Sequence, residues 1–188
     1  INSPNINYDS GDGTTVKVST KSDVPSEKNI SGTALASIIG ASADSGQEIY
    51  MTRASNSDGT SQGDSQSHIN GKNIDIRFAG KNGSREPINY RNNNKSEFDK
   101  IDIKASTTMN ASLKKFGYKN IKASTLKVST TTVGKDGKPT TTTTSHSVPG
   151  TKHLSNHYDH QHLQGYHPSI RTHRTALNIK QRPLNLNY

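Results

Sequence analysis

Hydrophobic residues along the chain occur in short groups separated by polar stretches, and their spacing predicts the secondary-structure elements. Small and apolar residues at helical spacing predict a short helix over 31–43, with Ser31 as the candidate N-cap. A second helix is predicted over 96–117, with Ser96 as its cap and Gly117 at its end. Both helices are short enough to belong to a mixed fold rather than to a helical bundle.

Alternating hydrophobic and polar residues predict the strands. Strands are predicted over 14–19, 47–53, 72–80, 118–124 and 125–133. In the segment 72–80, Ile74 and Ile76 share one face of the strand, whereas Asp75 and Arg77 share the other. Asp75 therefore points away from the apolar face and is available for chemistry, although an ion pair with Arg77 is a simpler role for it.

The segment from 127 to 147 is rich in threonine and has the pattern of a hairpin. Two Thr-rich arms flank the sequence GKDGKP at 134–139, whose glycines and proline are typical of a turn. An irregular Thr-rich loop is the alternative. Together the elements predict an α+β fold, with a small antiparallel β-sheet that bears a metal site, a few flanking helices and a Thr-rich β-hairpin.

Composition limits the core and the kinds of metal ligand. Only 27% of the residues are hydrophobic and 5% are aromatic, so part of the chain is expected to be loop or hairpin with little burial. No run of 18 apolar residues is present to span a membrane. The chain has no cysteine, so any metal must be held by His, Asp or Glu. The net charge of +9 favours a polyanion such as nucleic acid or the bacterial envelope, or serves solubility alone.

The histidines supply the candidate chemistry. Seven of the eight lie between 146 and 173, and His68 is the exception. If 158–164 is a strand, His160 and His162 project from one face. His68, Asp75 and one histidine of this pair make a ligand set that suits catalytic Zn²⁺, which lowers the pKa of a bound water from about 15.7 to about 7.

Hydrolysis at such a zinc site also needs a base and a positive group. Asp159 and His160 are the candidates for the base, and Arg53 is the candidate for steadying negative charge on the substrate. The segment HINGKNID at 68–75 fits the pattern H-x-x-G-x-x-x-D, and HQH at 160–162 fits H-x-H.

Together these motifs resemble those of the D-Ala-D-Ala carboxypeptidase group of zinc peptidases, within the wider class that includes lysostaphin and hedgehog domains. The resemblance covers about residues 50–165. It implies His68, Asp75 and His162 as the zinc ligands. It also implies Arg53 as a substrate-binding residue and Asp159, three residues before the last ligand, as the general base.

Strand alternation and the resemblance disagree about the base. Alternation places Asp159 on the face opposite His162 and favours His160, whereas the resemblance favours Asp159, which would then lie just before the strand or on a bulge. We expect Asp159 to be the base and His160 to donate a hydrogen bond in the transition state. The chain departs from the family pattern at Gln66, where a serine is usual, and at Asn73, where alanine is usual.

The resemblance implies a zinc metallopeptidase that hydrolyses amide bonds in bacterial peptidoglycan, in stem or cross-link peptides. We expect a polar N-terminal leader with a first strand over 1–30, the catalytic domain over 31–168 and a basic tail over 169–188. We also expect a secreted or periplasmic monomer, the C-terminal toxin or effector domain of a larger secreted protein, with an immunity or carrier protein as a partner and no nucleic-acid partner. A metal-dependent nuclease toxin and a non-catalytic cell-wall-binding module remain the alternatives.

Overall fold

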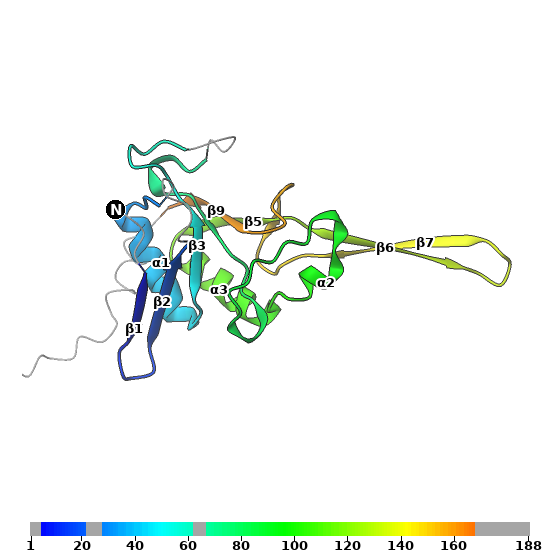
Figure 1. Cartoon of the computed structure of the whole chain (residues 1–188), viewed down its shortest axis with the longest axis horizontal. Helices are drawn as coiled ribbons and strands as arrows, with labels where there is room; N and C mark the ends of the chain where they lie inside the picture. Colours follow the sequence, from blue (N-terminus) through cyan, green and yellow to red (C-terminus); the bar gives the residue numbers. More distant parts are fainter. Residues whose placement is uncertain (1–4, 22–27, 62–66, 168–188) are drawn as a thin grey trace, which may run out of the picture.

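The computed structural model describes residues 5–21, 28–61 and 67–167, and these form a mixed sheet with helices on one face (Figure 1). The predicted tail 169–188 and parts of the predicted leader 1–30 lie outside the described residues, as do residues 62–66. The seven strands of the sheet are, in spatial order, β1 (Ile6–Asp9), β2 (Thr15–Thr20), β3 (Ile49–Arg53), β4 (Ile74–Ile76), β9 (Gln161–Tyr166), β5 (Tyr118–Ala123) and β8 (Lys152–His153). The protein is therefore an α+β protein, as the sequence predicts.

The middle of the sheet is antiparallel, and its flanks include parallel pairs. Strands β3, β4, β9 and β5 pair antiparallel in that order, as predicted for the part that carries the site. The predicted small antiparallel sheet is extended, because β2 pairs parallel with β3 and β5 pairs parallel with β8. The first parallel pair arises because α1 connects β2 to β3, and a crossover of this kind returns the chain in the same direction.

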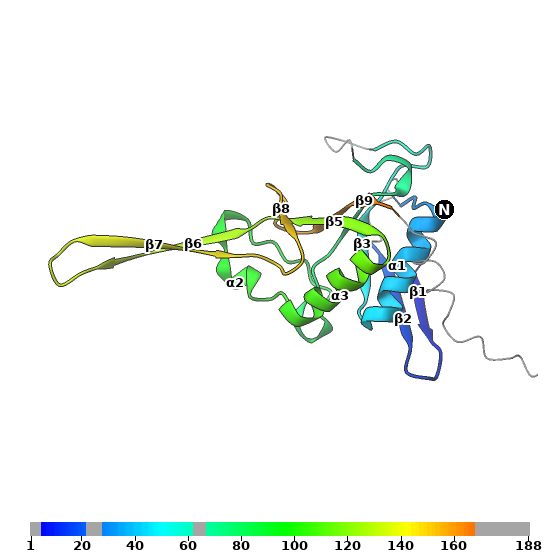
Figure 2. The same cartoon turned by 180° about the vertical axis from the view of Figure 1, so that it is seen from behind.

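The helices of the described chain are α1 (Gly32–Ser45), α2 (Lys95–Phe98) and α3 (Ile103–Lys115), together with the short 3₁₀ turns η1 (Ile69–Gly71), η2 (Lys81–Gly83) and η3 (Arg91–Asn93). Helices α1 and α3 lie side by side against one face of the sheet, and they are in front of the strands when the molecule is seen from behind (Figure 2). None of the described helices combines the length and the apolar character that a bilayer crossing requires. The opposite face of the sheet is left to carry polar side chains.

Helix α1 begins and ends where the sequence signals indicate. The Ser31 side chain accepts a hydrogen bond from the backbone N–H of Ala34, and Gly46 ends the helix in the left-handed conformation, with φ of 65°. The predicted helix over 31–43 is confirmed and continues to Ser45.

The predicted single helix over 96–117 is wrong, because the chain breaks at Asp102. The Asp102 side chain accepts from the backbone N–H of Ala105 and starts α3, while Asn94, rather than Ser96, caps the short helix α2. Between the two helices, Ile101 is buried and forms a β-bridge with Gly80. Burial of Ile101 and the strong capping residue after it therefore interrupt the helical pattern.

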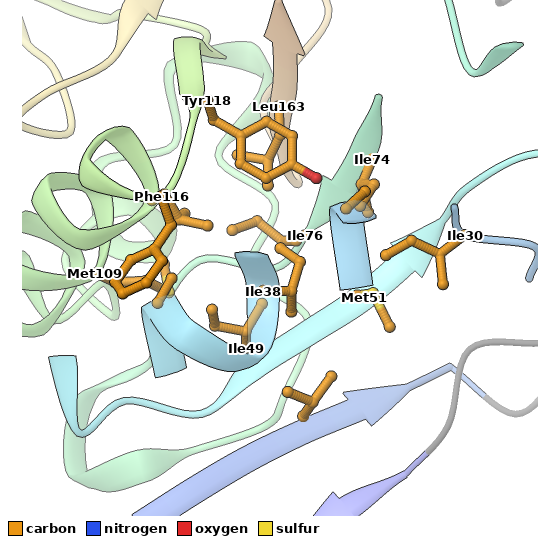
Figure 3. Close-up of a cluster of buried hydrophobic side chains, with 14 of the residues drawn as sticks. Ile30, Ile38, Ile49, Met51, Ile74, Ile76, Met109, Phe116, Tyr118 and Leu163 are labelled. Carbon is orange, nitrogen blue, oxygen red and sulfur yellow. The ribbon is translucent and has the colours of Figure 1, made fainter. Parts of the chain in front are cut away.

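Two groups of buried side chains hold the fold together. The larger fills the space between the sheet and helices α1 and α3, and it includes Ile38, Ile76 and Phe116 (Figure 3). The helices approach closely where the Phe116 ring lies against Gly40, since a Cβ atom on that glycine would lie 2.4 Å from the ring. The smaller group packs beside α2 and comprises Phe78, Ile88, Tyr90, Phe98, Ile101, Ala123, Leu126 and Val148.

The Thr-rich hairpin is present and projects from the body of the molecule (Figure 1). Strands β6 (Leu126–Val133) and β7 (Pro139–His146) pair antiparallel over their whole length, and most of their side chains are exposed. Hydroxyl groups face each other across the strands, with oxygen–oxygen distances of 2.9 Å between Ser129 and Thr143 and between Thr131 and Thr141. The alternative of an irregular loop is therefore excluded.

Candidate metal centre

His68 and Asp75 come from one turn and the strand that follows it. His68 immediately precedes η1, in which Asn70 and Gly71 both adopt positive φ, at 57° and 61°. The chain then enters β4, where Asp75 lies on the face opposite Ile74 and Ile76, as the alternation predicts. This tight reversal places His68 Nε2 3.2 Å from Asp75 Oδ2. The motif H-x-x-G-x-x-x-D is thus one local unit of structure.

Gly71 is required in this unit for two separate reasons. Its positive φ disfavours any side chain, and a Cβ atom there would lie 2.4 Å from the backbone oxygen of Asn29. Its own carbonyl oxygen accepts a hydrogen bond from the backbone N–H of Ser31 at 3.0 Å. Gly71 therefore joins the first motif to the start of α1.

Gly71→Ala is expected to lower the free energy of unfolding by about 2–4 kcal/mol, because the left-handed conformation and the backbone clash both add cost. Gly83→Ala is the matched control, since Gly83 has φ of 70° but open space around it. The control should lose only about 1 kcal/mol. Urea denaturation followed by circular dichroism measures both, and equal losses would show that the contact with Asn29 is unimportant.

His162 reaches the same point through the pairing of β9 with β4. The two strands are antiparallel, and Asp75 is directly opposite His162 in the register. His162 Nδ1 lies 2.6 Å from Asp75 Oδ1, so the two histidines approach different oxygens of one carboxylate. The exposed fractions are 1% for His68 and 5% for each of the other two residues. One donor atom from each of the three residues lies within 4.8 Å of the others.

The donor set fits a metal ion. His68 Nδ1 lies 3.1 Å from the backbone oxygen of Asn73, which fixes that ring nitrogen as the N–H donor and leaves Nε2 facing Asp75. Buried imidazole and carboxylate groups that converge in this way are typical of transition-metal ligands. The predicted ligands His68, Asp75 and His162 are therefore brought together, and they can hold a metal ion.

The charge of Asp75 is strongly favoured in this setting. Burial by itself raises the pKa of the Asp75 carboxyl, but its interactions with the His162, His68 and His160 imidazoles outweigh that effect and hold the pKa far below its usual range. Asp75 is therefore ionised at neutral pH and can serve as an anionic ligand.

Asp159 and His160 form a hydrogen-bonded pair beside this centre. Both lie just before β9 rather than in it, so neither follows the strand alternation. Asp159 Oδ1 lies 2.7 Å from His160 Nδ1, and His160 Nε2 lies 3.7 Å from Asp75 Oδ2. The imidazole therefore stands between the Asp159 carboxylate and the metal ligands.

The electrostatics of the pair follow from this geometry. Burial lowers the pKa of His160, but Asp159 and Asp75 together outweigh it and raise that pKa above its ordinary value. The hydrogen bond from His160 is the main cause that lowers the pKa of Asp159. Asp159 is therefore ionised, and its side chain remains 53% exposed.

A cavity of about 290 Å³ opens over one side of the centre. Its lining is Lys21, Thr52, Arg53, Asp75, Arg77, Pro87, Asp159 and His160. Arg53 reaches it because it is paired with Asp75 in the register between β3 and β4, after an irregularity in β3. The structure thus places all of the predicted catalytic residues, Arg53, Asp159 and His160, around one cavity that includes a metal ligand.

His157 is a site residue that the sequence analysis does not single out. Its ring centroid lies 4.7 Å from that of His160 and 5.7 Å from that of His162. Its Nδ1 lies 2.7 Å from the backbone oxygen of Ser155, and partial burial lowers the pKa of the ring. The density of histidines in this segment is the signal in the sequence that points to His157. The sequence does not indicate which of these histidines face the centre, because a turn before β9 carries some of them.

A scan against protein-family models matches no family, and searches of the curated proteins and of the solved structures find no match for the chain. The likeness to the D-Ala-D-Ala carboxypeptidase group of zinc peptidases therefore rests on the two motifs and on the residues around them.

Proposed function

We propose that the protein is a zinc-dependent hydrolase of peptide amide bonds, and that its substrates are stem or cross-link peptides of bacterial peptidoglycan. The observation that carries the proposal is the convergence of His68, Asp75 and His162 beside a cavity that is lined by one of them, Asp75, and by Asp159, His160 and Arg53. A metal-binding module without catalysis has no need of a base such as Asp159 or His160 beside the ligands.

Zinc is the ion that we propose for the centre. Two imidazoles and one carboxylate, beside a cavity that reaches the carboxylate, form a donor set that is typical of catalytic zinc in peptidases. When bound there, zinc supplies a Lewis acid that polarises the scissile carbonyl and lowers the pKa of water.

The side chains around the cavity supply the remaining chemistry. His160 Nε2 faces the centre, and the hydrogen bond between His160 Nδ1 and Asp159 fixes the orientation of the ring. This arrangement suits a group that takes a proton from the attacking water and passes it to the leaving amine. Arg53 is positioned to stabilise negative charge on the substrate.

The proposed substrate class comes from the motif resemblance, and this substrate class implies where the protein acts. Peptidoglycan peptides would place the protein in a secreted or periplasmic location. The positive net charge of +9 favours an anionic envelope. An immunity or carrier protein and a monomeric state belong to the same proposal.

The experiment is digestion of purified peptidoglycan with the zinc-loaded protein, followed by mass analysis of the released fragments. We expect new peptide fragments, their loss when a chelator is present, and their return when zinc is added in excess. Plasmid DNA incubated in parallel tests the nuclease alternative. Intact peptidoglycan together with nicked plasmid would replace the proposal with a nuclease, and zinc binding without turnover of either substrate would leave a binding module.

A further inference from the structure

The sheet face that carries the metal ligands has unequal chemistry on its two sides. On one side, the cavity includes three cationic side chains, Lys21, Arg53 and Arg77, and two carboxylates, Asp75 and Asp159. On the other side, a separate hollow is lined by Ser67, Ile69, Asn70, Lys72, Asn73, Asn120, Gln164, Gly165 and Tyr166. Four carboxamides and a single cationic side chain line that second hollow. A bound substrate would therefore meet charged groups in one direction, with cations in the majority, and mostly neutral polar groups in the other.

Arg77 is held in place on the cationic side. Its guanidinium carbon lies 4.2 Å from the centroid of the Tyr50 ring, and its Nη1 donates a hydrogen bond to the backbone oxygen of Arg85. Stacking on an aromatic ring and a fixed hydrogen bond both orient the planar group before any ligand binds. Little entropy would then be lost when the remaining N–H groups bind an anion.

An ion pair with Asp75 does not explain the presence of Arg77. Within the described part of the chain, the ion pairs of Asp75 are with His68, His160 and His162 rather than with Arg77. The simpler role suggested by the sequence, an Arg77–Asp75 pair, is therefore not the one found.

The position of Arg77 sets the part of a substrate that it can reach. Arg77 follows Asp75 by two residues, which corresponds to about 7 Å along an extended chain, and both residues line the cavity. An extended peptide advances by about the same distance in two residues. A group bound by Arg77 would therefore lie one or two residues from a bond that is cut beside Asp75.

We propose that Arg77, together with Lys21, forms a carboxylate-binding subsite that selects peptides with an acidic group one or two residues from the scissile bond. The inference rests on the proposed function for the position of that bond, and it names the substrate class more closely. A carboxylate accepts paired hydrogen bonds from a guanidinium, so the subsite distinguishes an acid from the amide of the same shape.

The test uses two fluorescent peptides that differ only in glutamate or glutamine next to the expected scissile bond. Fluorescence anisotropy with the metal-free protein measures binding without cleavage, and KM and kcat are measured with the zinc-loaded protein. We expect the glutamate peptide to bind about tenfold to hundredfold more tightly. Arg77→Gln should remove this preference, and Arg77→Lys should retain part of it because the charge remains.

Lys72→Gln is the matched control, because Lys72 lines the hollow on the other side and the same charge is lost. This variant should keep the preference for glutamate. Equal binding of the two peptides, binding of neither, or a preference that survives Arg77→Gln would overturn the subsite. Tighter binding of the glutamate peptide without cleavage of any peptide would support the subsite and contradict the proposed function. Cleavage without a preference for glutamate would support the proposed function and contradict the subsite.

Discussion

Asp75→Asn is expected to abolish zinc binding and to lower hydrolysis by more than about 10³-fold, the equivalent of about 4 kcal/mol of lost transition-state stabilisation. Asp75 is the anionic member of the ligand set, and each of its oxygens faces a different histidine. An amide offers a single neutral oxygen, and its NH₂ group would point at one of the two imidazoles. The substitution therefore removes the negative charge of the ligand set and disturbs the interaction of residue 75 with one of the two histidines.

Metal content after dialysis and thermal unfolding measure the effect separately from catalysis. Zinc at about 100 times its dissociation constant stabilises a folded protein by about 2.7 kcal/mol, which raises Tm by about 5–10 °C for a chain of this size. The wild-type protein should show this rise, and Asp75→Asn should not.

Asp99→Asn provides the control with the same chemical change. Asp99 lies on the surface in an ion pair with Lys95, away from the metal ligands. This variant should bind zinc and respond to it as the wild-type protein does. A stoichiometric amount of zinc retained by Asp75→Asn would show that the three residues are not the ligands.

The first half of the centre could be predicted because its geometry is local. In H-x-x-G-x-x-x-D, the glycine permits the reversal after His68, and the alternation in β4 turns Asp75 away from the core. Only a few residues separate the two ligands, so the sequence itself limits where each can lie. The same locality explains why the Ser31 cap and the Thr-rich hairpin are confirmed.

The second half depended on a pairing between distant segments. Asp75 and His162 are neighbours only because β9 inserts between β4 and β5, and no local pattern indicates that order. The motif resemblance selected His162. The position of His157 beside His160 and His162 could not be predicted either, because a turn rather than a regular strand carries it.

Weak or interrupted patterns account for the differences in the fold. β1 is short and mostly exposed, so no alternation marked it, although β1 and β2 extend the sheet into the segment predicted as a leader. The break between α2 and α3 depends on burial of Ile101, which a helical pattern does not reveal. Tertiary contacts rather than local sequence patterns therefore determine both strand β1 and the break between α2 and α3.

His160→Ala is expected to lower kcat by about 10²–10⁴-fold while zinc binding is retained, because the variant removes an imidazole that faces Asp75 but is not one of the three ligands. The sequence prediction that Asp159 is the base stays a prediction, and the geometry favours a different division of roles. His160 Nε2 is on the side of Asp75, whereas Asp159 Oδ1 is bonded to the far nitrogen of the same ring. Asp159 would then act by orienting His160.

Asp159→Asn distinguishes the two assignments. If Asp159 orients the imidazole, the kcat of this variant should fall by about 10–10²-fold, which is less than the fall in His160→Ala. The double variant should then be no slower than His160→Ala alone, because the effects of residues that act as a unit are not additive. Single-turnover kinetics on a defined peptide, with the metal content of each variant measured in parallel, provide the comparison. A loss in Asp159→Asn that far exceeds the loss in His160→Ala would assign proton removal to the carboxylate itself, and His160 would then be the hydrogen-bond donor.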